Sequence, residues 1–165
     1  MLDMTLPQLI KDDVQQLEEV LREFLERTDA TTVLLIDKGG FLIMHQGEAT
    51  QFDLTTLGAL ASGAFMANQT IAGLVSETNF NSIYQQGENF SMFVVNVDEH
   101  CLLMVIFKAQ MGVGVVKYFA ANAVERIARQ IQTARERDPH SGLDLSMLNL
   151  ADTQHVFRKK GSKGT

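Results

Sequence analysis

The sequence predicts an α/β fold of the α+β kind, a five-stranded antiparallel sheet with helices on both faces. Apolar residues recur at helical spacing in three segments, which indicates three amphipathic helices. Five short runs rich in β-branched and aromatic residues lie among them, separated by glycine or polar turn residues. With 165 residues, 45% of them hydrophobic, the chain is long enough for one domain. The predicted order is helix, two strands, helix, three strands, helix.

The N-terminal part predicts a helix followed by a hairpin. Pro7 suits a first helical turn, and the helix is expected to end near Thr28, where the apolar stripe stops. That stripe consists of Leu9, Ile10, Val14, Leu17, Val20, Leu21, Phe24 and Leu25. Residues 31–37 and 41–45 are apolar runs on either side of Lys38-Gly39-Gly40, which is a tight turn signal. We expect the two runs to pair as a hairpin with both faces covered.

The second helix is expected from Leu54 to about Val75, with Asp53 as its N-cap. One apolar stripe is expected to face inward: Leu57, Leu60, Ala64, Ile71, Leu74 and Val75. The opposite side is small or flexible: Ala59, Ser62, Gly63, Met66, Gln69, Thr70 and Gly73. Because each helical glycine costs about 1 kcal/mol relative to alanine, we expect another backbone or a partner surface to approach this side closely. For Met66 the alternatives are contact with a partner, packing in a self-dimer, and packing within the chain.

The remaining sequence predicts an antiparallel meander and a last helix. Phe80–Gln86 is short, polar and alternating, as edge strands are, whereas Cys101–Phe107 is almost wholly apolar, as central strands are. Phe90–Val97 is the strand between them. A helix is expected over residues 113–137. Residues 1–137 are thus the predicted domain, and residues 138–165 a C-terminal extension that is partly disordered.

Composition and charge exclude several classes of function. The formal net charge is −6, and an acidic body repels phosphate backbones, so nucleic-acid binding is not expected. No run of about 18 apolar residues occurs, so no membrane span is expected. Cys101 is the only cysteine, which excludes an internal disulfide. The N-terminal residues lack the pattern of a secretory signal, and we expect a cytoplasmic location.

Reactive residue types gather at one place only, Asp98-Glu99-His100-Cys101. A turn followed by a buried strand cysteine is the favoured interpretation, and a nucleophile or metal site is the alternative. Gly112-Val113-Gly114 lies between a strand and a helix, but Lys117 stands where a dinucleotide loop has its third glycine. We therefore assign no catalytic residue, no metal ligand and no cofactor.

Several stretches in this order resemble the roadblock / dynein light-chain family over roughly residues 8–137. Residues 31–43 resemble the first hairpin of the family, and residues 52–74 resemble its central helix rich in alanine and glycine. Residues 102–107 and 112–127 resemble its last strand and last helix. Across residues 53–80 the likeness is to the MglB branch, regulators of bacterial gliding motility.

The resemblance implies a roadblock, profilin-like fold that forms two-fold homodimers, with joined edge strands and antiparallel central helices. It implies a dimer interface that includes Ala59, Phe80, Ser82 and Tyr84. It also implies a partner, a small Ras-like GTPase of the MglA type, whose GTP hydrolysis and nucleotide cycle the dimer promotes without a catalytic site of its own. The matching partner-binding positions are Ser62, Gly63, Met66, Gln69, Thr70 and Gly73. The pathway implied is cell polarity or motility.

Two other classes of function remain open. One is a non-catalytic scaffold for assembling signalling proteins, which would bind partners without altering a GTPase. The other is an enzyme or sensor module that uses the turn at residues 98–101. Activity of an MglA-like GTPase with and without this protein distinguishes the regulator from the scaffold, and Cys101→Ala tests the enzyme or sensor.

Overall fold

The computed structural model describes residues 6–137, in the predicted order of three helices and five strands. The predicted C-terminal extension, residues 138–165, lies outside the described residues. The elements are α1 (Lys11–Thr28), β1 (Thr32–Asp37), β2 (Leu42–Gly47), α2 (Leu54–Leu74), β3 (Ser82–Gln86), β4 (Phe90–Asn96), β5 (Cys101–Lys108) and α3 (Val113–Glu136).

The five strands form one sheet in the order β2-β1-β5-β4-β3, and every neighbouring pair is antiparallel. The predicted hairpin of β1 and β2 and the predicted meander of β3, β4 and β5 are confirmed. The apolar β5 is the central strand, and the polar β3 is an edge strand, as their compositions predict. Because helices cover β5 on both faces, seven of its eight residues are buried.

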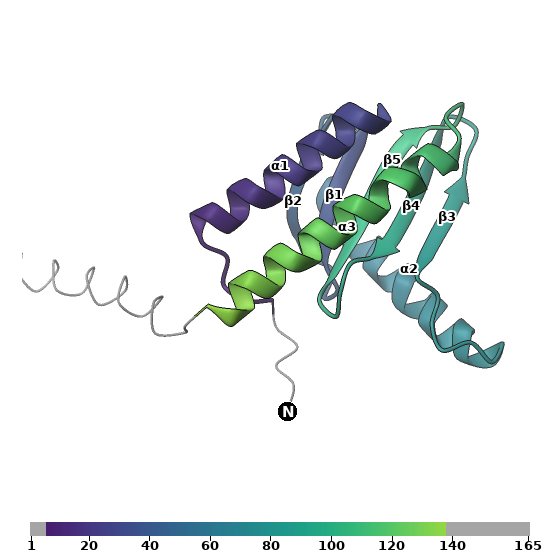
Figure 1. Cartoon of the computed structure of the whole chain (residues 1–165). Coiled ribbons are helices and arrows are strands. Elements are labelled where there is room, and N and C mark those ends of the chain that lie inside the picture. The colour runs from purple at the N-terminus through teal and green to yellow at the C-terminus, as the bar shows by residue number, and fades with distance from the viewer. Residues whose placement is uncertain (1–5, 138–165) are drawn as a thin grey trace, which may run out of the picture. The chain divides into compact units, whose positions relative to one another are not determined.

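Helices cover both faces of the sheet, as predicted: α1 and α3 lie on one face and α2 lies on the other (Figure 1). Successive side chains of β1 point to opposite faces of the sheet and so contribute to two hydrophobic cores. Val33 and Leu35 pack against α1 and α3, whereas Leu34 and Ile36 point to the side of α2. No helix in the described part of the chain is long and apolar enough to cross a membrane.

Helix α1 begins later than Pro7 suggests, and this prediction is wrong by about one turn. The backbone N–H of Ile10 donates to Oδ2 of Asp13 at 2.8 Å, which satisfies one of the free N–H groups at the helix start. Asp13 is buried, and its Oδ1 accepts from Nε2 of Gln130 on α3 at 2.8 Å. The helix therefore starts where a carboxylate can serve both its own N-terminus and the neighbouring helix.

Candidate functional site

Helix α2 starts where the sequence predicts, at the N-cap Asp53. The carboxylate of Asp53 accepts from the backbone N–H of Thr56 at 3.1 Å and from its hydroxyl at 2.6 Å. These two hydrogen bonds lower the pKa of Asp53 because they favour the ionised carboxylate. The cap fixes the first turn of α2 and hence which residues of the helix face the sheet.

The side of α2 that faces the sheet is not the side that the apolar pattern predicts. The buried residues are Leu54, Gly58, Ser62, Phe65 and Ala72. Five of the six members of the predicted inward stripe are instead exposed: Ala64, Leu60 by 66%, Ile71 by 46%, Leu74 by 80% and Val75 by 59%. The prediction fails because α2 is apolar or small on every side, so periodicity alone does not select one face.

Small residues let α2 lie close to β1 and to the turn that follows it. A Cβ atom on Gly58 would lie 3.8 Å from side-chain atoms of Ile36. The hydroxyl of Ser62 donates to the carbonyl oxygen of Lys38 at 2.6 Å. Ser62, one of the six predicted partner-binding residues, therefore directs its side chain to its own chain and is only 4% exposed.

The other predicted partner-binding residues divide into two groups. Gln69 is half-buried, and its Nε2 donates to the carbonyl oxygen of Phe80 at 2.7 Å, which holds the chain after α2 against the helix. Gly63, Met66, Thr70 and Gly73 are exposed, and Met66 has 51% of its surface free. A Cβ atom on either glycine would meet nothing within 4 Å. Packing among residues 6–137 therefore does not require these glycines, and the helix backbone there is open to a further segment or a second molecule.

The exposed surface of α2 thus has two adjoining sides, both away from its buried ridge. We call the side with Ala59, Gly63, Met66, Thr70 and Gly73 the small-residue side. We call the side with Leu60, Ala64, Ile71 and Leu74 the leucine side. The C-terminal half of α2 runs past the end of the strands (Figure 1), which leaves both sides uncovered there. An apolar patch of this kind on a globular domain marks an interaction surface.

The residues predicted for a dimer interface lie in two places. Phe80, Ser82 and Tyr84 lie on or just before β3, whose outer edge is paired with no strand of the described chain. The ring of Tyr84 stacks on Phe107 with centroids 6.2 Å apart. Ala59 lies instead against the turn between β1 and β2, since a Cβ atom on Gly40 would lie 3.3 Å from its Cα. The structure therefore brings three of the four predicted dimer-interface residues together at the edge of the sheet.

The turn at residues 98–101 is held by its own hydrogen bonds. Oδ1 of Asp98 accepts from the backbone N–H groups of His100 at 2.8 Å and Cys101 at 2.9 Å. Nζ of Lys38 donates to the carbonyl oxygen of Asp98 at 2.6 Å, and burial lowers the pKa of Lys38. Cys101 is fully buried, which agrees with a turn followed by a strand cysteine. No group of three or more metal-ligating side chains is found among residues 6–137.

Comparisons with known proteins point to one family. The Roadblock/LC7 domain matches residues 16–107 of the chain. The structure is similar to the gliding protein MglB of Thermus thermophilus, at 32% identity and a TM-score of 0.72, covering 77% of this chain and 96% of that one. An MglB with a tetrameric arrangement is 33% identical, with a TM-score of 0.71 and coverage of 78% and 96%. Myxococcus xanthus MglB has the same fold at 24% identity and a TM-score of 0.72, covering 77% and 96%. A comparison with curated protein sequences gives no match.

Proposed function

The chain belongs to the Roadblock/LC7 family, and from that premise we propose that it is a homodimeric regulator of a small Ras-like GTPase of the MglA type. The dimer binds the GTPase and promotes its GTP hydrolysis and nucleotide cycle, in a cytoplasmic pathway of cell polarity or motility. The observation that carries this proposal is α2, which is apolar on two sides that its own sheet leaves exposed. A helix that is apolar all round is normally buried, so α2 needs partners.

The two exposed sides of α2 suit two different partners. The leucine side and the open edge of β3 suit a second copy of the chain, since apolar burial and strand pairing together stabilise isologous dimers. The small-residue side suits the GTPase, because Gly63 and Gly73 allow a backbone to approach and Met66 adapts to an irregular surface. In this arrangement the homodimer presents two small-residue sides to GTPase molecules.

The dimer acts on the GTPase by contact rather than by supplying a reacting group. GTPase switch segments are ordered or released by small changes in their contacts, so a surface that binds one switch conformation shifts the nucleotide cycle. No arginine lies on α2, so the small-residue side offers no residue of the arginine-finger type. The acidic surface of the protein favours rapid association with a basic patch on the partner.

The first prediction tests the small-residue side. Met66→Arg combined with Thr70→Arg should abolish binding of an MglA-like GTPase from the same organism, because two long charged side chains would fill the surface that the glycines keep open. Binding is measured by titration of the fluorescently labelled GTPase, and GTP hydrolysis by single-turnover release of phosphate. The matched control is Gln8→Arg with Gln15→Arg, which adds the same charge at exposed positions outside α2.

Several outcomes of this experiment would contradict the proposal. If the unsubstituted protein neither binds the GTPase nor changes its turnover, the GTPase role is wrong. If the Met66 and Thr70 variant still binds, the partner surface is elsewhere. If that variant becomes a monomer, the small-residue side is instead a dimer contact. Binding without any change in hydrolysis or nucleotide exchange would favour the scaffold.

A further inference from the structure

A groove lies between α1 and α3, on the face of the sheet opposite α2. Its main hollow has a volume of about 500 Å³ and lies between the C-terminal half of α1 and the first half of α3. A second hollow of about 180 Å³ shares Val20 and Arg126 with the first and continues to Gln130 and Thr133. The two hollows therefore adjoin each other along the seam of the helices, with Arg126 between them.

The floor of the groove is apolar and aromatic. Val20 and Phe24 of α1 are almost fully buried, and Phe119 of α3 is half-buried beside them. Tyr118 is 76% exposed at one end of the groove, and its ring meets that of Phe119 edge to face with centroids 5.1 Å apart. An exposed aromatic next to an apolar floor is typical of an anchor position in protein recognition.

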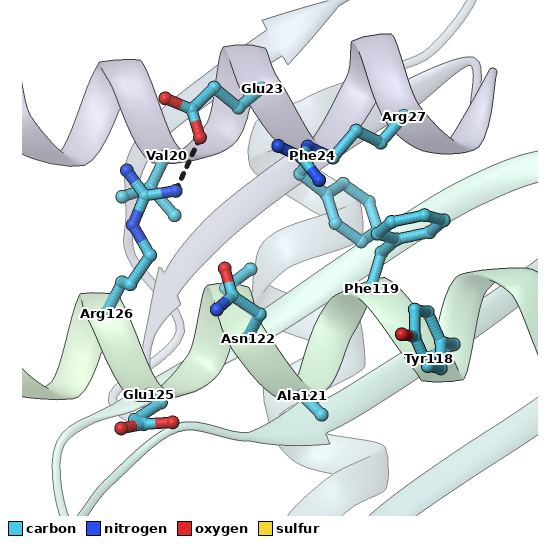
Figure 2. A pocket seen from close by; sticks show the side chains of 11 residues that line it. Val20, Glu23, Phe24, Arg27, Tyr118, Phe119, Ala121, Asn122, Glu125 and Arg126 are labelled. Carbon is cyan, nitrogen blue, oxygen red and sulfur yellow. Dashed lines mark hydrogen bonds and ion pairs between the residues drawn. The ribbon is translucent and has the colours of Figure 1, made fainter.

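The rim of the groove carries one more positive than negative charge, since Arg27, Arg126 and Arg129 face Glu23 and Glu125. Glu23 and Arg126 form an ion pair at 2.6 Å across the groove, and Glu125 pairs with Arg129 at 2.7 Å on α3. The side chain of Arg27 lies in no ion pair within 4.0 Å among the described residues, although its charge also acts on the carboxylate of Glu23. Its guanidinium points into the groove above Phe24, and the amide of Asn122 points in from α3 (Figure 2). The rim thus has a net positive charge, and the guanidinium of Arg27 is the part of it that faces the groove without a direct ion pair.

We propose that this groove binds an acidic amphipathic helix of a partner protein. A third helix packs naturally into the seam between two neighbouring helices, with its apolar side chains on the floor. One carboxylate of that helix pairs with Arg27, and an apolar side chain lies against Tyr118 and Phe119. Because the groove and α2 lie on opposite faces of the sheet, both can be occupied at once. The protein would then join two partners, independently of what α2 binds.

The test is selection from a display library of random 16-residue peptides on the full-length protein. Peptides with an acidic residue spaced at helical intervals from large apolar residues should be enriched. Arg27→Glu should weaken their binding at least about tenfold, because it replaces an attraction to the acidic residue by a repulsion between like charges. Arg27→Gln should give an intermediate loss, and Tyr118→Ala a loss through the apolar contact. Circular dichroism confirms that each variant is folded.

Arg22→Glu is the matched control. Arg22 also lies on α1, but it pairs with Glu19 and Glu26 and lines no part of the groove. Its substitution makes the same change of charge and should leave peptide binding unchanged. Enrichment of neutral or basic peptides, or an equal loss for Arg22→Glu and Arg27→Glu, would overturn the proposal. So would a change of oligomeric mass on Arg27→Glu, since the groove would then be an interface between copies.

Discussion

At the scale of single residues, a few polar side chains hold the elements of this protein in place. Ser62 ties α2 to the turn after β1, and Asp98 closes the turn between β4 and β5. Glu23 joins α1 to α3 through Arg126. Two of these contacts link segments that lie far apart in the sequence, so their partners are not evident from spacing alone.

The ion pair of Glu23 makes a prediction about pH. The hydrogen bond from Arg126 holds the pKa of Glu23 below its ordinary value of 4.5. The pair therefore stabilises the fold above that value, and its contribution is lost as the pH falls through the lowered pKa. Between about pH 6 and pH 3, the unsubstituted protein should lose more free energy of unfolding than Glu23→Gln does.

Urea unfolding at a series of pH values measures this difference. Glu18→Gln is the control, because Glu18 is exposed on the same helix and forms no ion pair with a described residue. The control should keep the steeper pH dependence of the unsubstituted protein. A Glu23→Gln profile with that same slope would show that the pair contributes nothing.

At the scale of elements, α2 has a composition that weakens it as an isolated helix. Gly63 lies in its interior and Gly73 is its last residue but one, and no neighbouring atom of the described residues occupies the space that their missing side chains leave. A helix retains such residues at a cost to its stability. The compensating role that we propose is close approach by the GTPase partner.

Substitution of these glycines separates stability from binding. Gly63→Ala should stabilise the chain by about 0.5–1 kcal/mol, because alanine is the better helix former, and Gly73→Ala at the helix end should add less than that. The variant with both substitutions should bind the MglA-like GTPase more weakly, since two methyl groups would hold the partner backbone away. Thermal unfolding in dilute solution measures the first effect and GTPase titration the second.

The control for this experiment is Gly114→Ala on α3. Gly114 is also helical and also has no atom within 4 Å of a built Cβ atom. Its substitution should leave GTPase binding unchanged. If the α2 variant is more stable and binds as tightly as before, the glycines have no role in partner approach.

At the scale of the whole molecule, the sheet leaves a strand edge and a helix side open on the same chain. The free edge of β3 and the exposed Leu60, Ile71 and Leu74 are the features expected of half a dimer interface. On this basis we propose that the functional unit is a dimer of two chains.

The dimer is tested by Ile71→Asp with Leu74→Asp. Two carboxylates on the leucine side would be buried without partners in the dimer, which costs far more than leaving them in water. Light scattering should therefore show the mass of two chains for the unsubstituted protein and of one chain for the variant. The control is Val115→Asp with Tyr118→Asp, two exposed apolar residues on α3. If only the control variant becomes a monomer, the dimer forms through the α1 and α3 face.

The order and type of the elements followed from the sequence alone, because helical and strand periods are local properties of the chain. Composition also predicted the places of two strands in the sheet. The apolar β5 was expected at the centre, and the short, polar β3 was expected at an edge. The family followed from the same ordered stretches, and the match over residues 16–107 confirms it.

The tertiary structure alone decided which surfaces of these elements are free. In α2, apolar or small residues lie on every side, so the buried ridge was selected by the fit of Gly58 and Ser62 against β1 and its turn. That selection left Leu60, Ile71 and Leu74 in solvent, contrary to the pattern-based prediction. The groove of Arg27 and Tyr118 likewise exists only because α1 and α3, about ninety residues apart in the chain, pack side by side on the sheet. Local periodicity determines whether a segment forms a helix or a strand. The packing between segments determines which side of each helix or strand stays exposed to a partner.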